Sequence, residues 1–223
     1  MKEAVKAEKD EVFDIELDID ILKANKELAE ENRKLLQKHG IKAVDIMGAI
    51  GAGKTSLIEK LVEALKAKYR IAAFKGDLTT TIDAEQIARH GVEVVPINTG
   101  KECHLDANLV KKALKRLDLT KIDLLFIENV GNLICPAEFP LGSQKRIVVI
   151  SVTEGPYMIV KHPFIFTNAD VAVINKIDLA KAMQVDIRKL EKDVETINPN
   201  AQVAFTNCRT GEGINKVIEA LRL

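Results

Sequence analysis

Beyond Gly40, short apolar runs alternate with stretches of helical periodicity. This alternation favours βα units on a mainly parallel sheet, because strands that are covered by helices on both faces are apolar throughout. The candidate strands are residues 43–47, 71–75, 92–97, 123–127, 147–152, 171–174 and 203–206. The helices expected between them are residues 54–68, 83–90, 105–117, 185–196 and 214–221. The pattern therefore predicts a three-layer α/β/α fold around a mainly parallel seven-stranded sheet.

The first 40 residues have a different pattern. Residues 12–19 alternate between apolar and acidic side chains, which predicts an extended segment or a bent lead into a helix. Residues 21–38 are rich in Leu, Ala, Glu and Lys, and they should form a helix that stops at Gly40. We therefore expect an N-terminal extension and helix, residues 1–40, to pack on a main domain formed by residues 41–223.

Composition narrows the functional classes. With 47% hydrophobic and 30% charged residues, the 223-residue chain has the make-up of a soluble globular protein with a sizeable core. Lys plus Arg and Asp plus Glu both number 33, so no excess of positive charge is available to attract nucleic acid. No apolar run approaches the roughly 18–20 residues of a bilayer span, and residues 1–10 lack the apolar core of a secretory signal. We expect a cytoplasmic protein with no membrane partner.

A glycine-rich segment lies between the first predicted strand and the helix that follows it. Its residues Gly48, Ala49, Ile50, Gly51, Ala52, Gly53, Lys54 and Thr55 match the pattern G-x-x-x-x-G-K-[ST], and Ser56 comes next. Glycines allow backbone N–H groups to wrap closely around phosphate oxygens, and the helix adds its positive end. Lys54 should reach the β- and γ-phosphates, and the Thr55 hydroxyl should coordinate Mg²⁺. The flanking strand and helix favour a P-loop NTPase over a chance glycine-rich turn.

A second motif, Asn175-Lys176-Ile177-Asp178, directly follows the predicted strand 171–174, about 120 residues after the P-loop. This is the N-K-x-D pattern of GTPases. A carboxylate at Asp178 can accept hydrogen bonds from N1–H and the 2-amino group of guanine, which adenine does not offer. Lys176 is expected to cover the base and Asn175 to brace the phosphate loop. The predicted substrate is therefore GTP.

A third loop, residues 207–213, stands where GTPases carry a backbone segment that contacts the guanine oxygen. Cys208 occupies the position that is usually alanine, and a small buried residue beside the base is the simplest interpretation of this thiol. We expect Cys208 and Arg209 to belong to the nucleotide site.

Two further segments follow predicted strands and are candidates for sensing the γ-phosphate. Gly76-Asp77 opens residues 78–81, and Asp77 would hold Mg²⁺ through water or orient the attacking water. Glu128 would hold Mg²⁺ through water, while the N–H group of Gly131 would meet the γ-phosphate. Capping of a loop is the alternative role for either acid. The candidate catalytic residues are thus Lys54, Asp77, Glu128 and Gly131.

Cys103-His104 lies at the start of a predicted helix, and Cys135 comes four positions after Gly131. Packing would be the ordinary role of an isolated cysteine, but thiolate and imidazole together favour Ni²⁺ or Zn²⁺ over Mg²⁺. Three donors are too few for a closed structural site, whereas a twofold dimer would supply up to six. Because Cys135 follows the proposed γ-phosphate sensor directly, GTP binding would create or dismantle this metal site.

These motifs resemble those of the hydrogenase nickel-incorporation GTPases, P-loop GTPases of the SIMIBI class. The resemblance covers about residues 20–223 and rests on 48–55, 76–77, 103–107, 128–133, 135–136 and 175–178. It implies a low intrinsic GTPase rate, dimerisation favoured by GTP, and nickel or zinc at the dimer interface through Cys103, His104 and Cys135. The implied partners are a nickel-delivery zinc accessory protein and the hydrogenase large subunit. The chain lacks the amino-terminal cysteine motif and histidine-rich tract of some relatives, so no nickel-storage role is expected.

Other interpretations remain open at the level of sequence. A urease-type nickel chaperone GTPase shares the P-loop and N-K-x-D but carries Cys-Pro-His where this chain has Cys103-His104. In a GTP-gated interaction module, Cys103 and Cys135 would only pack. A metal buffer would carry more donors than three cysteines and four histidines. The donor set itself leaves nickel and zinc as equal alternatives.

Overall fold

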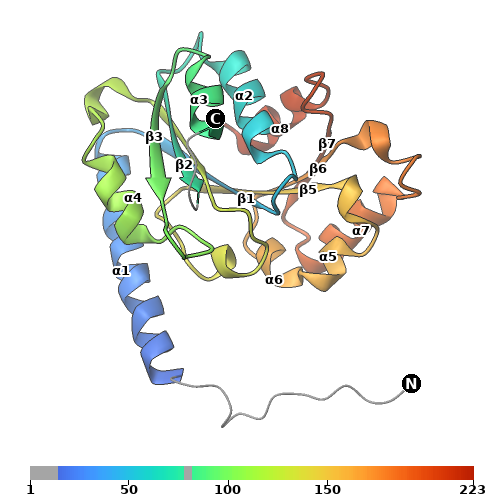
Figure 1. Ribbon diagram of the computed structural model, residues 1–223, viewed down its shortest axis with the longest axis horizontal. Coiled ribbons are helices and arrows are strands. Elements are labelled where there is room, and N and C mark those ends of the chain that lie inside the picture. Colours follow the sequence, from blue (N-terminus) through green and yellow to red (C-terminus); the bar gives the residue numbers. More distant parts are fainter. Residues whose placement is uncertain (1–14, 78–81) are drawn as a thin grey trace.

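The computed structural model describes residues 15–77 and 82–223 of the chain. Within these ranges, seven strands form one sheet in the order β3-β2-β4-β1-β5-β6-β7, and each neighbouring pair is parallel (Figure 1). The strands are β1 (Lys42–Gly48), β2 (Ile71–Asp77), β3 (Glu93–Asn98), β4 (Leu124–Glu128), β5 (Lys145–Ser151), β6 (Val171–Asn175) and β7 (Gln202–Thr206). The predicted parallel seven-stranded sheet is confirmed.

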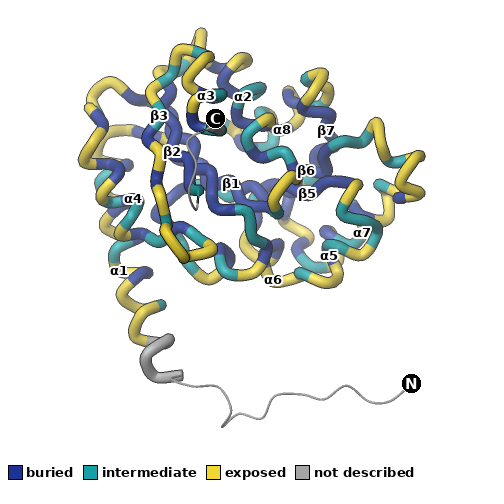
Figure 2. The backbone as a smooth tube through the Cα atoms, in the orientation of Figure 1, coloured by how far each residue is buried: buried dark blue, intermediate teal, exposed yellow. Residues whose placement is uncertain are grey.

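Helices cover both faces of this sheet. They are α1 (Ile15–Lys38), α2 (Lys54–Leu65), α3 (Ile82–Ala88), α4 (Ala107–Leu114), α5 (Met158–Lys161), α6 (Pro163–Phe166), α7 (Ile187–Ile197) and α8 (Ile214–Leu221). One face packs against α2, α3 and α8, with Val44 and Ile46 of β1 in that core. The other face packs against α1 and α4 at one end and α5, α6 and α7 at the other. Figure 2 shows the strands as a buried central layer, so the α/β/α prediction is confirmed.

The strand order brings three carboxyl ends to one edge of the sheet. In the parallel register, Ile46 of β1 lies beside Glu128 of β4, and Lys75 of β2 lies on the other side of Glu128. Segments that leave these strands therefore start next to one another, although they are far apart in the sequence. In open parallel sheets, ligands bind at this edge.

The prediction of an extended segment over residues 12–19 is wrong for residues 15–19, which belong to α1. Residues 12–14 lie outside the described residues. A short alternating stretch is a weak signal, and adding residues to an existing helix costs far less than starting one, because each added residue brings its own hydrogen bond.

The start of α4 also differs from the predicted boundary. α4 begins at Ala107 rather than 105, since the Asp106 carboxylate accepts a hydrogen bond from Leu109 N at 2.7 Å and caps the helix.

The N-terminal helix α1 lies along α4 on the outside of the sheet (Figure 1). Between residues 20 and 38, its buried positions are Asn25, Ala29, Asn32 and Leu36, spaced by three or four residues as one face of a helix requires. The division of the chain at residues 40 and 41 stays a prediction. In the ranges that the structure describes, none of the helices has the length and apolar character needed to cross a membrane.

Candidate nucleotide and metal site

The glycine-rich loop joins β1 to α2, as the sequence predicts. Gly53, the residue before α2, has φ 103°, and a Cβ atom here would collide with the side-chain amide of Asn175. The Lys54 side chain turns back across the loop and donates hydrogen bonds to Gly48 O and Ala49 O, each at 3.0 Å. Burial lowers the pKa of Lys54, and the nearby Glu128 carboxylate opposes this effect. The loop is thus shaped to surround an anion with backbone N–H groups and one ammonium group.

A cavity of about 480 Å³ opens above this loop. It is lined by Ile50, Gly51, Gly53, Lys54, Thr55, Ser56, Lys75, Gly76, Asp77, Asp83, Gln86, Glu128, Val130, Gly131 and Lys176. The four candidate catalytic residues of the sequence analysis all belong to this lining. Gly131 lies so close to the loop that a Cβ atom on it would collide with the Ile50 side chain. The first candidate switch includes residues 78–81, which lie outside the described residues.

Glu128 is held by a network that local sequence motifs do not reveal. Its carboxylate accepts hydrogen bonds from Thr55 Oγ1 at 2.9 and 3.0 Å and forms an ion pair with Lys75 Nζ at 2.9 Å. Lys75 also pairs with Asp83 at 3.2 Å. Burial alone would lower the pKa of Lys75, but the Glu128 and Asp83 carboxylates together raise it. Burial raises the pKa of Glu128, and Lys75, Lys54 and Thr55 counteract this.

Lys75 and Asp83 were missed by sequence reasoning. The only signal was a charged residue at the end of the otherwise apolar run 71–75. Since Lys75 and Glu128 are 5% and 1% exposed, each needs the other's charge. Within this pair, Glu128 accepts the hydrogen bonds of the Thr55 hydroxyl, the group that the sequence predicts to coordinate Mg²⁺.

Replacing Lys75 with Met should lower the free energy of unfolding by about 3 kcal/mol at neutral pH, because it leaves the Glu128 carboxylate buried without its nearest cation. Urea denaturation of the two proteins measures this difference. The difference should shrink as the pH falls, since a protonated Glu128 no longer needs a cation. Lys60→Met is the matched control: it removes the ion pair with Glu63, whose side chain is 41% exposed, and should cost less than about 1 kcal/mol. An equal loss in both variants would contradict this assignment.

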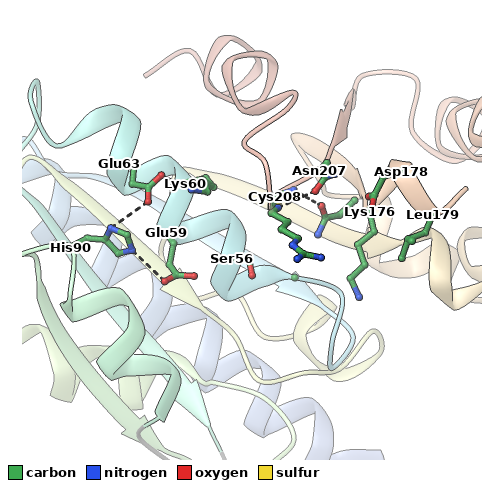
Figure 3. Close-up of a pocket in the computed structure, with 13 residues that line it drawn as sticks. Ser56, Glu59, Lys60, Glu63, His90, Lys176, Asp178, Leu179, Asn207 and Cys208 are labelled. Carbon is green, nitrogen blue, oxygen red and sulfur yellow. Dashed lines mark hydrogen bonds and ion pairs between the residues drawn. The ribbon is translucent and has the colours of Figure 1, made fainter.

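The second cavity, of about 570 Å³, is the one drawn in Figure 3, and it adjoins the first because Gly53, Ser56 and Lys176 line both. Its lining residues are Gly53, Ser56, Glu59, Lys60, Glu63, His90, Asn175, Lys176, Asp178, Leu179, Asn207, Cys208 and Arg209. Lys176 and Asp178 lie on one wall, beside the loop that carries Cys208 (Figure 3). On the opposite side, His90 pairs with Glu59 at 3.2 Å and with Glu63 at 3.7 Å. The size of this second cavity suits a nucleoside, and Asp178 places an acidic group on the wall where the sequence predicts guanine recognition.

Asn175 ties the two cavities together. Its Nδ2 donates to Ala52 O of the phosphate loop at 2.9 Å, which is the brace expected from the sequence. Its Oδ1 accepts from Thr206 Oγ1 at 3.0 Å and from Cys208 N at 3.1 Å. Lys176 donates to Gly51 O at 2.8 Å. Cys208 is 4% exposed, and burial raises the pKa of its thiol, so this cysteine packs as a small residue beside the cavity.

The structure brings Cys103, His104 and Cys135 together. The two sulfur atoms lie 3.1 Å apart, and Cys103 Sγ lies 4.0 Å from His104 Nδ1. One donor atom from each residue fits within 4.8 Å of the others. Such spacing suits an ion bound at roughly 2.0–2.3 Å from thiolate and imidazole donors. Burial lowers the pKa of His104, and its ring packs on Phe139 with the ring centroids 3.9 Å apart. Neutral imidazole is the form that binds metals.

One asparagine joins this cluster to the phosphate loop, and a second one holds the backbone just after His104. Asn132 donates its backbone N–H to Gly48 O at 3.1 Å and its side-chain amide to Cys103 O at 3.3 Å. Its Oδ1 accepts from Ile134 N at 2.8 Å, next to Cys135. The deeper Asn129 accepts from Leu105 N at 3.0 Å. Both belong to the motif 128–133, but the sequence analysis assigned them no role.

The fold and the two adjoining cavities place the chain in the class of P-loop GTPases. Residues 42–205 match the family described as the CobW/HypB/UreG nucleotide-binding domain. The chain belongs to this family, and the resemblance to hydrogenase nickel-incorporation GTPases is confirmed.

Relatives of this chain carry the name hydrogenase maturation factor HypB. The chain is 62% identical over 200 residues to the probable hydrogenase maturation factor HypB of Methanocaldococcus jannaschii, covering 90% of each chain. It is 37% identical over 202 residues to HypB of Escherichia coli K12, covering 91% of this chain and 70% of that one.

Solved structures agree with the fold. HypB from Archaeoglobus fulgidus superposes with a TM-score of 0.83 at 47% identity, covering 89% of this chain and 97% of that one. HypB from Helicobacter pylori, solved in complex with nickel, has the same TM-score at 31% identity and covers 89% and 95%.

Proposed function

We propose that this protein is a GTP-hydrolysing metallochaperone that couples GTP binding and hydrolysis to nickel insertion during [NiFe] hydrogenase maturation. The observation that carries this proposal is the position of Asn132, which bonds to the phosphate loop and to the backbone of a metal-donor residue. A change in the nucleotide bound at the phosphate loop can therefore move Cys103 in the metal cluster. The designation of the relatives as hydrogenase maturation factors, and the nickel complex of one of them, support the choice of nickel as cargo.

In the nucleotide half of the site, backbone N–H groups of 48–53 and the Lys54 ammonium group bind the phosphates. Thr55, Asp77 and Glu128 hold Mg²⁺ directly or through water, and the bound ion neutralises charge on the phosphates. The Gly131 N–H group contacts the γ-phosphate, and the Asp178 carboxylate recognises guanine. These residues belong to the proposed nucleotide domain, 41–223. We propose a slow intrinsic turnover, suited to a switch.

In the metal half, Cys103, His104 and Cys135 bind Ni²⁺, with Zn²⁺ as the competing ion. Cys103 is exposed while His104 and Cys135 are half-buried, so the cluster lies at the surface of the chain. A surface cluster with three donors can be completed by a second copy across a twofold axis. We propose that GTP favours this homodimer. Cargo comes from a nickel-delivery zinc accessory protein and goes to the hydrogenase large subunit, in the cytoplasm.

Urease maturation is the second candidate function. One relative, from Helicobacter hepaticus, carries the name hydrogenase/urease maturation factor HypB and is 35% identical over 201 residues. Hydrogenase and urease activities in a deletion strain separate the two. Loss of hydrogenase activity alone, restored by added nickel, is the expected result. A selective loss of urease activity would favour the second candidate.

Titration of the full chain with Ni²⁺ and with Zn²⁺ tests the coupling. The titrations are run with GDP and with a non-hydrolysable GTP analogue, while the mass in solution is followed. We expect a tighter dimer with the analogue than with GDP, and a metal Kd that differs about 10-fold between the two states. Asn132→Ala should reduce this difference. Asn98→Ala should not, because it removes a bond to Gly100 N at the start of the Cys103 loop and leaves the bonds between Asn132, the phosphate loop and Cys103 in place. Equal metal affinity and equal mass in both nucleotide states would remove the switch from the proposal.

A further inference from the structure

Helix α1 buries two asparagines on its inner face. Asn25 and Asn32 are 5% and 1% exposed, and they lie seven residues apart, beside Ala29 and Leu36 on the same face. A buried side-chain amide costs free energy unless its polar atoms find partners, and apolar residues at these positions would pack α1 more simply. Their partners therefore indicate what the two asparagines do.

Both asparagines bind the same two segments of the main domain. Asn25 Oδ1 accepts a hydrogen bond from Ala107 N at 2.8 Å, and its Nδ2 donates to Pro140 O at 3.0 Å. Asn32 Nδ2 donates to Ala107 O at 2.8 Å and to Leu141 O at 3.1 Å. Each amide thus bridges the start of α4 and the segment 140–141.

These two segments are the continuations of the metal-donor loops. Ala107 is three residues after His104, and Pro140 is five residues after Cys135. The second segment passes directly over α1: Gly142, with φ +99°, lies so close that a Cβ atom on it would meet Ala29 O and the Asn32 side chain. The two loops therefore reach the metal cluster from anchor points that α1 holds at a fixed separation.

We propose that α1 is part of the metal site, and that Asn25 and Asn32 are positioning residues that set the distance between the Cys103-His104 loop and the Cys135 loop. This inference rests on the proposed metal function. Residues that orient metal ligands typically change metal affinity by about 10–100-fold when they are removed. The asparagines touch backbone groups rather than donor atoms, so they act by placing the loops. α1 then serves the metal site as well as the stability of the domain.

The test separates positioning from simple attachment of α1. Ni²⁺ affinity, the Ni²⁺–thiolate absorption band, nucleotide affinity and thermal stability are measured for the full chain and its variants. Asn25→Ala and Asn32→Ala should lower Ni²⁺ affinity about 10–100-fold and shift the absorption band, with nucleotide affinity within about twofold of the original. Asn25→Asp keeps the acceptor for Ala107 N but sets a buried carboxylate oxygen against Pro140 O, which repels it, so Ni²⁺ affinity should fall at least as far as in Asn25→Ala.

Leu36→Ala is the matched control. Leu36 is fully buried on the same face of α1, but its apolar side chain forms no hydrogen bond, so its truncation removes packing and leaves the asparagine hydrogen bonds to both donor loops in place. We expect a lower Tm with Ni²⁺ affinity within about threefold. An equal affinity loss in Leu36→Ala, or unchanged affinity in Asn25→Ala and Asn32→Ala, would overturn the positioning role and leave the metal function intact. Absence of Ni²⁺ binding by the unaltered chain would overturn both proposals.

Discussion

Replacing Asp178 with Asn should lower the affinity for GTP on the order of 10³-fold and transfer the preference to xanthosine triphosphate. The Asp178 carboxylate lies on the wall of the second cavity, beside Lys176 and the Cys208 loop (Figure 3). It can accept from both N1–H and the 2-amino group of guanine, whereas an amide presents an N–H donor to that amino group and leaves it unpaired. Xanthine has a carbonyl oxygen in place of the amino group, which restores the pairing.

Competition binding with GTP, ATP and xanthosine triphosphate measures this change. Glu59→Gln is the matched control, because Glu59 lines the same cavity but pairs with His90 at 3.2 Å on the opposite side. The Glu59→Gln variant should keep the preference for GTP over ATP and xanthosine triphosphate. Retention of GTP preference in Asp178→Asn, or an equal loss in Glu59→Gln, would show that another group recognises the base.

Removing either surface thiol, by Cys103→Ala or Cys135→Ala, should lower Ni²⁺ affinity on the order of 10²–10³-fold. Structural zinc sites with four ligands contribute about 10–16 kcal/mol, or roughly 2.5–4 kcal/mol for each ligand. The two sulfur atoms lie 3.1 Å apart, close enough to share one ion. Since neither cysteine lines the nucleotide cavities, GTP affinity in the absence of metal should stay within about threefold.

The third cysteine supplies the control. Cys208 is buried beside the second cavity and does not belong to the metal cluster, so Cys208→Ala should leave Ni²⁺ affinity unchanged. Isothermal titration of each variant, with the mass in solution followed in parallel, gives affinity and stoichiometry. Full Ni²⁺ affinity in both Cys103→Ala and Cys135→Ala would mean that these residues only pack. That result would remove this cluster as the metal site and favour a GTP-gated interaction module in which the two cysteines pack.

The amino-acid sequence by itself determined the fold class, the phosphate loop and the candidate base-recognition motif. Each depends on neighbours in the chain: Gly48 to Thr55 form one turn between a strand and a helix, and Asn175 to Asp178 leave one strand together. Residues that are contiguous in the sequence stay close together, so a motif of this kind is recognised once its flanking strand and helix are predicted. The sequence also singled out Cys103, His104 and Cys135 by their chemistry, although it left their contact unproven.

Only the tertiary structure decided which distant residues meet. The ion pair of Lys75 with Glu128 arises because β2 lies beside β4, an order that no local pattern specifies. Asn132, which follows β4, reaches Gly48 because β4 also lies beside β1, and its side chain reaches Cys103 in the segment that follows β3. Asn25 and Asn32 appear in the sequence as two polar interruptions of an amphipathic helix, and their partners lie 75 to 115 residues away. Short-range periodicity specifies elements, but the hydrogen bonds that join them follow from packing in three dimensions.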